Sequence, residues 1–262
     1  MSSNEIIEVQ WKNHPYRLSD GTWLSFSDIY QILGRVIDRE EKKLKLAVIY
    51  GSGVGTYGSH AGWITDLLYV PEIISRIALW SLKRGMQLDI VSKLDIDVIS
   101  DYRVTKEEKE EAMKILKDYN LLIVGDGSVN EVYIKVMEQY EKDERCLVKS
   151  LTPIGGIKSM TGGKVTKYPL DTEALAGLLT MLVNPWSNGN RVVIICAGNT
   201  SAGTIAALKL LYLMLKDPDK YGRDNLRDGR TPAKIVMARC KKYNLQEEPP
   251  MHVGDVDFTV VE

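Results

Sequence analysis

The chain has 262 residues, of which 44% are hydrophobic, so it is long and apolar enough to build a large α/β core. Its 34 basic and 35 acidic side chains almost cancel, and the net charge of −1 excludes a strong overall field that would attract nucleic acid or an anionic membrane. We therefore predict neither a nucleic-acid partner nor a membrane partner.

The N-terminus and the cysteines indicate a cytoplasmic protein. Residues 1–10 lack the basic flank and apolar run of a signal peptide, and the longest apolar stretches, such as 205–215, are shorter than a membrane span. Cys146, Cys196 and Cys240 form no C-x-x-C pair, as expected of buried thiols in a reducing compartment.

The first part of the chain, 1–44, is predicted to be an appendage to the core. Residues 5–23 have the pattern of a β-hairpin, and Ser25 or Ser27 is expected to cap a helix over 29–39. This segment is a candidate cover for a sheet edge or a contact in a homo-oligomer. No linker divides the chain, so we treat 1–262 as one domain with its core at 45–262.

The core alternates strands and helices. Three continuous apolar runs end in glycine, as strands buried on both faces of a parallel sheet do. Such alternation predicts a three-layer, Rossmann-like α/β fold with a mostly parallel sheet and helices on both faces. The predicted strands are 46–50, 88–91, 121–124, 192–197, 233–238 and 258–261, and the predicted helices are 64–84 (with a bend at Pro71 as an alternative to a straight helix), 105 onward, 129–141, 171–183 and 204–215. The predicted connections are a loop or hairpin at 153–167, a turn at 184–190 and a loop at 217–231.

The turn after the first apolar run, 51–62, is a candidate phosphate-binding loop. It contains G-x-G-x-x-G directly after a strand, a motif whose glycines let the backbone approach a phosphate. A dinucleotide, another anionic ligand and a structural turn all remain alternatives, because the helix starts late and no acid ends a second strand about 20 residues on. His60 is a candidate acid or base. The candidate ligand-binding residues are Gly53, Gly55, Thr56 and Gly58.

The second turn, 125–131, offers further candidates. Asp126 has the chemistry to bind a ribose or a magnesium ion, the one cofactor that the sequence suggests, and Glu131 is a second candidate catalytic group. The sequence Gly125-Asp126-Gly127-Ser128-Val129-Asn130-Glu131 resembles the G-G-D-G-T-x-N-E loop of diacylglycerol kinases and NAD kinases, with Val124 in place of the first glycine and Ser128 in place of threonine. The resemblance implies that Gly125, Asp126, Gly127, Asn130 and Glu131 handle nucleotide phosphates. The alternative is a capping box, with Ser128 as the N-cap.

The third turn, 198–204, again joins a buried strand to a helix. Its hydroxyl groups and glycines are candidate ligand contacts, whereas Ser201 as a nucleophile lacks both a G-x-S-x-G elbow and an assignable His and Asp. The candidate residues are Gly198, Asn199, Thr200, Ser201, Gly203 and Thr204.

The stretch 120–211 as a whole carries a wider resemblance. Its glycine turns, the Asn184-Pro185 element and the Gly203-Thr204 pair are similar to the Rossmann-like C-terminal domain of archaeal S-layer-like proteins and their stand-alone relatives. That resemblance implies a fold and no activity.

Three functions remain open from the sequence. The first is binding or sensing of a nucleotide or another phosphorylated, anionic small ligand in a crevice of glycine-rich turns. The second is a phosphotransferase or hydrolase that acts on such a ligand through His60, Asp126 and Glu131. The third is a structural or oligomerising protein whose glycines only permit tight packing. No residues have metal-ligand spacing.

Overall fold

The structure is a computed structural model. It describes residues 14–52, 69–99, 101, 103–150, 156–160, 165–169, 175–222, 232–239, 243–244, 251–252 and 256–261.

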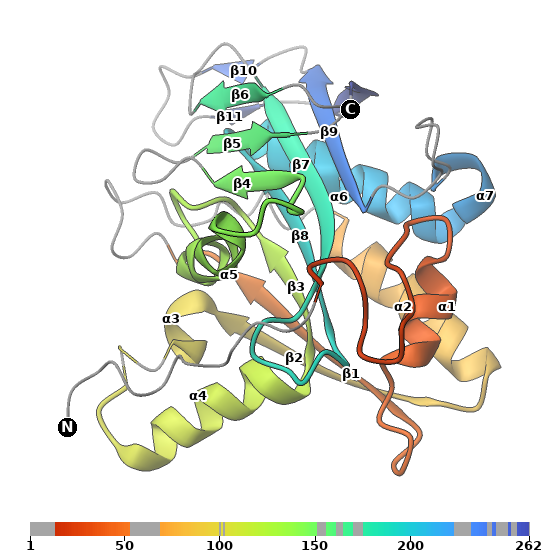
Figure 1. The fold of residues 1–262 in the computed structure, drawn as a ribbon. Helices are drawn as coiled ribbons and strands as arrows, with labels where there is room; N and C mark the ends of the chain where they lie inside the picture. Colours follow the sequence, from red (N-terminus) through yellow and green to blue (C-terminus); the bar gives the residue numbers. More distant parts are fainter. Residues whose placement is uncertain are drawn as a thin grey trace.

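Within these residues a seven-stranded mixed sheet forms the centre of the molecule (Figure 1). Neighbouring strands are parallel from β8 through β3 and β1 to β2, and antiparallel from β8 through β7 and β9 to β12. The sheet is therefore partly parallel, and the prediction of a mostly parallel sheet was wrong for one half. In spatial order the strands are β12 (Asp257–Val260), β9 (Ala233–Arg239), β7 (Ala176–Val183), β8 (Val192–Gly198), β3 (Asn120–Val124), β1 (Lys43–Tyr50) and β2 (Gln87–Leu94).

The antiparallel half follows from β7, which the sequence analysis assigned to a helix over 171–183. All eight residues of Ala176–Val183 are buried, and they pair with β8 on one side and β9 on the other. A short, uninterrupted apolar run suits a buried helix and a strand buried on both faces equally well. Periodicity alone could not separate the two.

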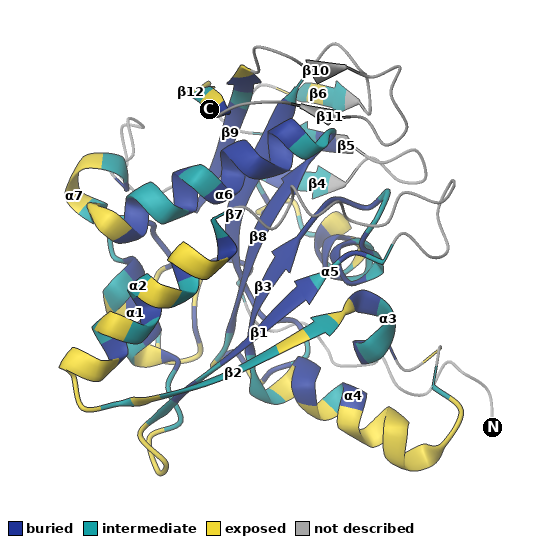
Figure 2. Ribbon diagram, turned by 180° about the vertical axis from the view of Figure 1, so that it is seen from behind, coloured by how far each residue is buried: buried dark blue, intermediate teal, exposed yellow. Residues whose placement is uncertain are grey.

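Helices cover both faces of the sheet, so the predicted three layers are confirmed (Figures 1 and 2). One face packs against α1 (Ile29–Arg35), α2 (Val70–Lys83) and α6 (Ser201–Lys216); α7 (Pro218–Tyr221) follows α6. The other face packs against α3 (Asp95–Val98), α4 (Lys106–Asp118) and α5 (Glu131–Glu141). The small antiparallel sheets are β4 (Val148–Ser150) with β5 (Gly156–Ser159) and β6 (Thr166–Pro169), and β10 (Tyr243–Asn244) with β11 (Met251–His252).

Strand β1 contributes side chains to the hydrophobic clusters on both faces of the sheet. Leu46 and Val48 belong to the cluster with α2 and α6, whereas Ala47 and Ile49 belong to the cluster with α4 and α5. Successive side chains of a strand point to opposite faces, so a run without polar interruptions fills both layers.

Helix starts were predicted with mixed success. Thr105 and Glu108 form the expected capping box of α4. Helix α2 begins at Val70, with Pro71 in its first turn, where a proline needs no hydrogen-bond donor, so the predicted bend at Pro71 was wrong. The cap of α1 is Asp28, which makes no side-chain capping bond, so the prediction of Ser25 or Ser27 was also wrong.

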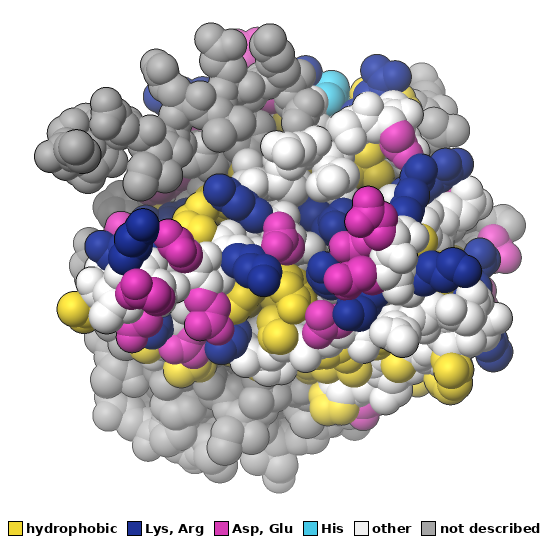
Figure 3. Space-filling view, turned by 90° about the horizontal axis from the view of Figure 1, so that it is seen from below, with side chains coloured by type: hydrophobic (Ala, Val, Ile, Leu, Met, Phe, Trp, Pro, Cys, Tyr) yellow, Lys and Arg dark blue, Asp and Glu magenta, His cyan; other side chains and the backbone are white. Residues whose placement is uncertain are grey.

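The N-terminal hairpin is described only in part: a bridge pairs Arg17 with Trp23, and the predicted first arm lies outside the described residues. Figure 3 shows acidic and basic side chains interspersed over one face, in keeping with the near-zero net charge. Among the described helices, none has the length and apolar character needed to cross a membrane.

Candidate functional site

The carboxyl ends of β1, β3 and β8 lie at one edge of the sheet (Figure 1). These three strands are adjacent and parallel, and their register pairs Tyr50 with Val124 and Val124 with Cys196. Gly51 and Gly125 directly follow Tyr50 and Val124, and Gly198 stands two residues after Cys196. The strand order also reverses here, because β2 lies on one side of β1 and β3 on the other, and ligands of open α/β sheets bind at such a switch point.

A buried carboxylate joins the first turn to the second. Asp95, the first residue of α3, is fully buried. Its Oδ1 accepts hydrogen bonds from the backbone N–H groups of Ser52 at 2.9 Å and Ile96 at 2.8 Å, and its Oδ2 accepts one from Glu131 at 2.8 Å. Glu131 is the first residue of α5. The Asp95 carboxylate therefore lies where an anionic ligand of this helix would bind.

Asn130 fixes the second turn from the inside. This fully buried side chain caps α5 by accepting a hydrogen bond from the Tyr133 N–H at 3.2 Å, and its Nδ2 donates to the carbonyls of Ile49 at 3.2 Å and Val124 at 3.0 Å. It thereby ties the end of β1 to the end of β3. The prediction of Ser128 as the cap was wrong.

Ser128 instead forms hydrogen bonds with Asp126. The backbone N–H and the hydroxyl of Ser128 both donate to Oδ1 of Asp126, a carboxylate that is 2% exposed. This local ring of hydrogen bonds is a common way for aspartate to hold a turn. Asp126 is thus engaged within its own turn.

Gly51 and Gly125 are needed for close contact with Val129. A Cβ on Gly51 would lie 2.4 Å from the Val129 carbonyl oxygen, and a Cβ on Gly125 would lie 2.7 Å from Val129 Cγ2. Gly125 also has φ of +99°, which side chains rarely tolerate. Packing of one turn on the other accounts for both glycines.

The third turn is built by close backbone packing. A Cβ on Gly203, in the first turn of α6, would lie 2.1 Å from the Ala176 carbonyl oxygen of β7, and one on Gly198 would lie 2.2 Å from the Thr204 nitrogen. Helix α6 therefore starts unusually close to the sheet, where only glycine fits.

The start of α6 carries no carboxylate of its own. Its cap is the neutral hydroxyl of Thr200, which accepts a hydrogen bond from the Gly203 N–H at 3.2 Å, and its first turn has no acidic residue. Asn199 and Thr204 are buried, whereas Thr200 and Ser201 are partly exposed. The positive end of a 16-residue helix dipole thus meets only neutral side chains of its own turn.

The remaining predicted residues are only partly placed. Glu131 is partly exposed, and its carboxylate lies 3.8 Å from Lys135 Nζ. Within the part of the chain that the structure describes, no three His, Cys, Asp or Glu side chains are close enough to hold a metal ion. The predicted residues of the first turn, Gly53, Gly55, Thr56, Gly58 and His60, lie outside the described residues.

Asp95 is the residue that the sequence analysis missed. It directly follows β2, so it belongs to the same edge as the glycine turns. The signal in the sequence is an acid at the end of the second strand. The dinucleotide-binding motif predicts this acid about 20 residues after its glycines, whereas Asp95 stands further along the chain. In this protein that acid binds backbone N–H groups of the chain.

Burial favours the neutral forms of two side chains near the edge, Cys196 and Tyr50. Burial raises the pKa of the Cys196 thiol, which therefore stays protonated and is a poor nucleophile. At the end of β1, burial also raises the pKa of Tyr50, and a hydrogen bond with Ser92 opposes that effect.

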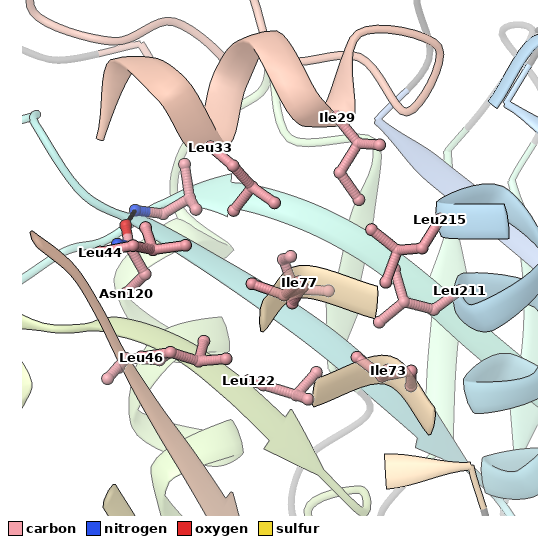
Figure 4. Close-up of a pocket in the computed structure, with 13 residues that line it drawn as sticks. Ile29, Leu33, Leu44, Leu46, Ile73, Ile77, Asn120, Leu122, Leu211 and Leu215 are labelled. Carbon is pink, nitrogen blue, oxygen red and sulfur yellow. Dashed lines mark hydrogen bonds between the residues drawn. The ribbon is translucent and has the colours of Figure 1, made fainter. Parts of the chain in front are cut away.

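Two cavities lined by described residues lie away from this edge. One of about 10 Å³ is enclosed between α1, α2, α6 and the sheet (Figure 4), and it has room for about one water molecule at most. Its lining is apolar except for Asn120, whose amide binds backbone groups of Val36, Lys45 and Val192. A wider, open groove of about 740 Å³ runs along residues 138–145 at the far end of α5.

Comparison of the sequence with protein-family models and with curated proteins finds no match. The partly parallel α/β fold agrees with the coarse expectation from the Rossmann-like resemblance. Kinship with the archaeal S-layer-like domain or with the kinase loop stays a prediction.

Proposed function

We propose that the chain binds a small anionic ligand, a nucleotide or another phosphorylated metabolite, at the start of α6 beside the carboxyl ends of β3 and β8. The observation that carries this proposal is the contrast between two neighbouring helix starts. The first turn of α5 binds the carboxylate of Asp95, whereas α6 begins with a neutral cap and no acid. An anion gains the favourable dipole and amide interactions at α6 without competing with a carboxylate of that turn.

Partly exposed hydroxyl groups support this location. Thr200 and Ser201 stand at the cap and first position of α6, where a ligand approaching the strand ends would meet them. Hydroxyl and backbone N–H donors are common partners of phosphate oxygens. The start of α6 also adjoins the switch point between β1 and β3, the place where open α/β sheets commonly bind ligands.

One observation favours a second candidate, a structural role without any ligand. Packing against the chain itself accounts for Gly51, Gly125, Gly198 and Gly203, so these glycines need no phosphate to explain them. Under this reading the turns exist to bring strands and helices into close contact.

A thermal-shift screen of nucleotides and sugar phosphates, each with and without magnesium, separates the two candidates. A ligand at 100 times its Kd stabilises the folded state by about 2.7 kcal/mol, which corresponds to a rise in Tm of about 5 °C or more for a chain of this size. Stabilisation that requires magnesium would instead favour the phosphotransferase or hydrolase alternative. A screen without any stabilising compound would contradict ligand binding and leave the structural role.

A matched pair of variants locates the site. Ser201→Asp adds a carboxylate at the first position of α6, which favours the helix dipole but repels an anionic ligand, whereas Ser201→Asn has nearly the same shape without charge. We expect the aspartate variant to lose the ligand-induced rise in Tm and the asparagine variant to keep most of it. Equal ligand responses in both variants would place the ligand elsewhere.

A further inference from the structure

Strand β2 forms an open edge of the central sheet (Figure 2). Its eight residues pair with β1 in an uninterrupted register from Gln87 to Leu94, and no residue of β2 is buried. In the described part of the chain no strand pairs with its outer side. Proteins usually protect a long, regular edge with proline, a bulge or a cover, because it readily pairs with another strand. Neither a proline nor a bulge interrupts β2.

The hydrogen-bonding groups on this edge can be assigned from the pairing with β1. The N–H of Gln87 donates to the Lys42 carbonyl at 3.0 Å, so Gln87 and every second residue after it direct their backbone groups toward β1. The backbone groups of Leu88, Ile90 and Ser92 therefore point outward. The next outward N–H, that of Leu94, donates to Asp97.

We propose that two copies of this chain associate through antiparallel pairing of their β2 strands, across a twofold axis at Val91. In this register Asp89 of each copy lies opposite Lys93 of the second copy, and Leu88 lies opposite Leu94. Because the arrangement is symmetric, the favourable charge pair occurs twice. This inference is independent of the ligand proposed for α6.

Charge complementarity selects this register over its neighbours. A shift by two residues in one direction places Asp89 opposite Val91 of the second copy, and a shift in the other places Val91 opposite Lys93. Each charge then lacks its counterpart. Opposite charges stabilise directly facing positions of antiparallel strands, and like charges destabilise them.

The geometry of the pairing strengthens these side-chain contacts. Since the backbone groups of Asp89, Val91 and Lys93 point toward β1, their cross-strand pairs are of the non-hydrogen-bonded kind, in which side chains approach most closely. Ile90 faces Ser92 of the second copy in a hydrogen-bonded pair. The Tyr119 hydroxyl donates to Asp89 Oδ2 at 3.1 Å and orients that carboxylate.

Apolar surface accompanies the edge. Leu94 is 42% exposed, and on α2, which packs against β2, Leu79 and Leu82 are 53% and 74% exposed. A second copy would shield Leu94 directly and bring the two α2 helices toward the axis.

Charge reversal and charge exchange test the proposal. Sedimentation velocity or light scattering of the full chain, up to about 100 μM, should show a dimer. Lys93→Glu and Asp89→Lys each place like charges opposite one another twice, so each is expected to weaken dimerisation about tenfold or more. The double variant Asp89→Lys with Lys93→Glu restores opposite charges and is expected to recover the dimer. Lys106→Glu, on exposed α4, is the control for Lys93→Glu, because it changes the net charge by the same amount.

A second variant tests the backbone pairing. The N–H of Ser92 points away from β1, so Ser92→Pro keeps the ladder with β1 while it removes a donor from the proposed interface. We expect a monomer with an unchanged circular dichroism spectrum. A wild-type chain that stays monomeric, or a dimer that survives Ser92→Pro and both charge reversals, would overturn the proposal.

Discussion

The first turns of α5 and α6 are capped and joined to the sheet in two different ways. Both helices follow a buried parallel strand and a glycine turn at one edge of the sheet. At α5 buried polar side chains satisfy the backbone, with Asn130 as the cap and Asp95 as a carboxylate from another element. At α6 the backbone itself comes within van der Waals contact of β7, and the Thr200 hydroxyl caps the helix.

This difference teaches that a glycine-rich turn after a strand does not by itself indicate a phosphate site. The second turn has the more suggestive sequence, yet its helix start already binds an internal carboxylate. The third turn has the plainer sequence and a helix start that no acid of its first turn neutralises. The electrostatic state of the helix start distinguishes the two turns better than their glycine pattern does.

The largest expected effect comes from Asp95→Ala. The substitution leaves the N–H groups of Ser52, Ile96 and Glu131 without their buried acceptor. We expect a loss of about 4 kcal/mol in the free energy of unfolding, measured by urea denaturation. Asp101→Ala is the control, because the Asp101 carboxylate is 69% exposed and pairs with Lys135 at the surface. If both variants lost the same small amount, Asp95 would not organise the edge.

The packing at α6 predicts a reversal of sign between two helical glycines. Alanine usually stabilises a helix relative to glycine, and Gly34→Ala in α1 should do so by about 0.5–1 kcal/mol, because the nearest atom to its Cβ is 3.8 Å away on Trp80. Gly203→Ala instead drives a Cβ into the Ala176 carbonyl and should destabilise by about 3 kcal/mol. Thermal unfolding of the two variants gives both signs. Stabilisation by Gly203→Ala would show that α6 is free to move away from β7.

The sequence was informative where local patterns decide the structure. Apolar runs that end in glycine located β1, β3 and β8, and because parallel strands end at one edge, the neighbourhood of their turns followed. The sequence was misleading where the structure of a segment depends on partners far away in the chain. The strand β7 depends on pairing with β8 and β9, neither of which can be inferred from its own apolar run.

The candidate site shows the same limit. The partners of Asp95 are 43 and 36 residues away in the chain, at Ser52 and Glu131, so no local spacing indicates a shared carboxylate. The cap of α5 was misassigned to Ser128 for a related reason. Ser128 matches the local capping pattern. Asn130 caps the helix instead, and its side chain also donates hydrogen bonds to carbonyls of β1 and β3, which are distant in the chain and which a local pattern does not reveal.

Removal of the caps of α5 and α6, one at a time, tests the difference between the two helix starts and is expected to have smaller effects. Asn130→Ala removes three buried hydrogen bonds, two of them to strand carbonyls, and should cost about 2–3 kcal/mol. Thr200→Ala removes one hydrogen bond at a partly exposed cap and should cost about 1 kcal/mol. Urea denaturation measures both values. Equal costs would mean that the end of α5 is no more strongly tied to the sheet than the end of α6, because the additional bonds of Asn130 would then contribute nothing to stability.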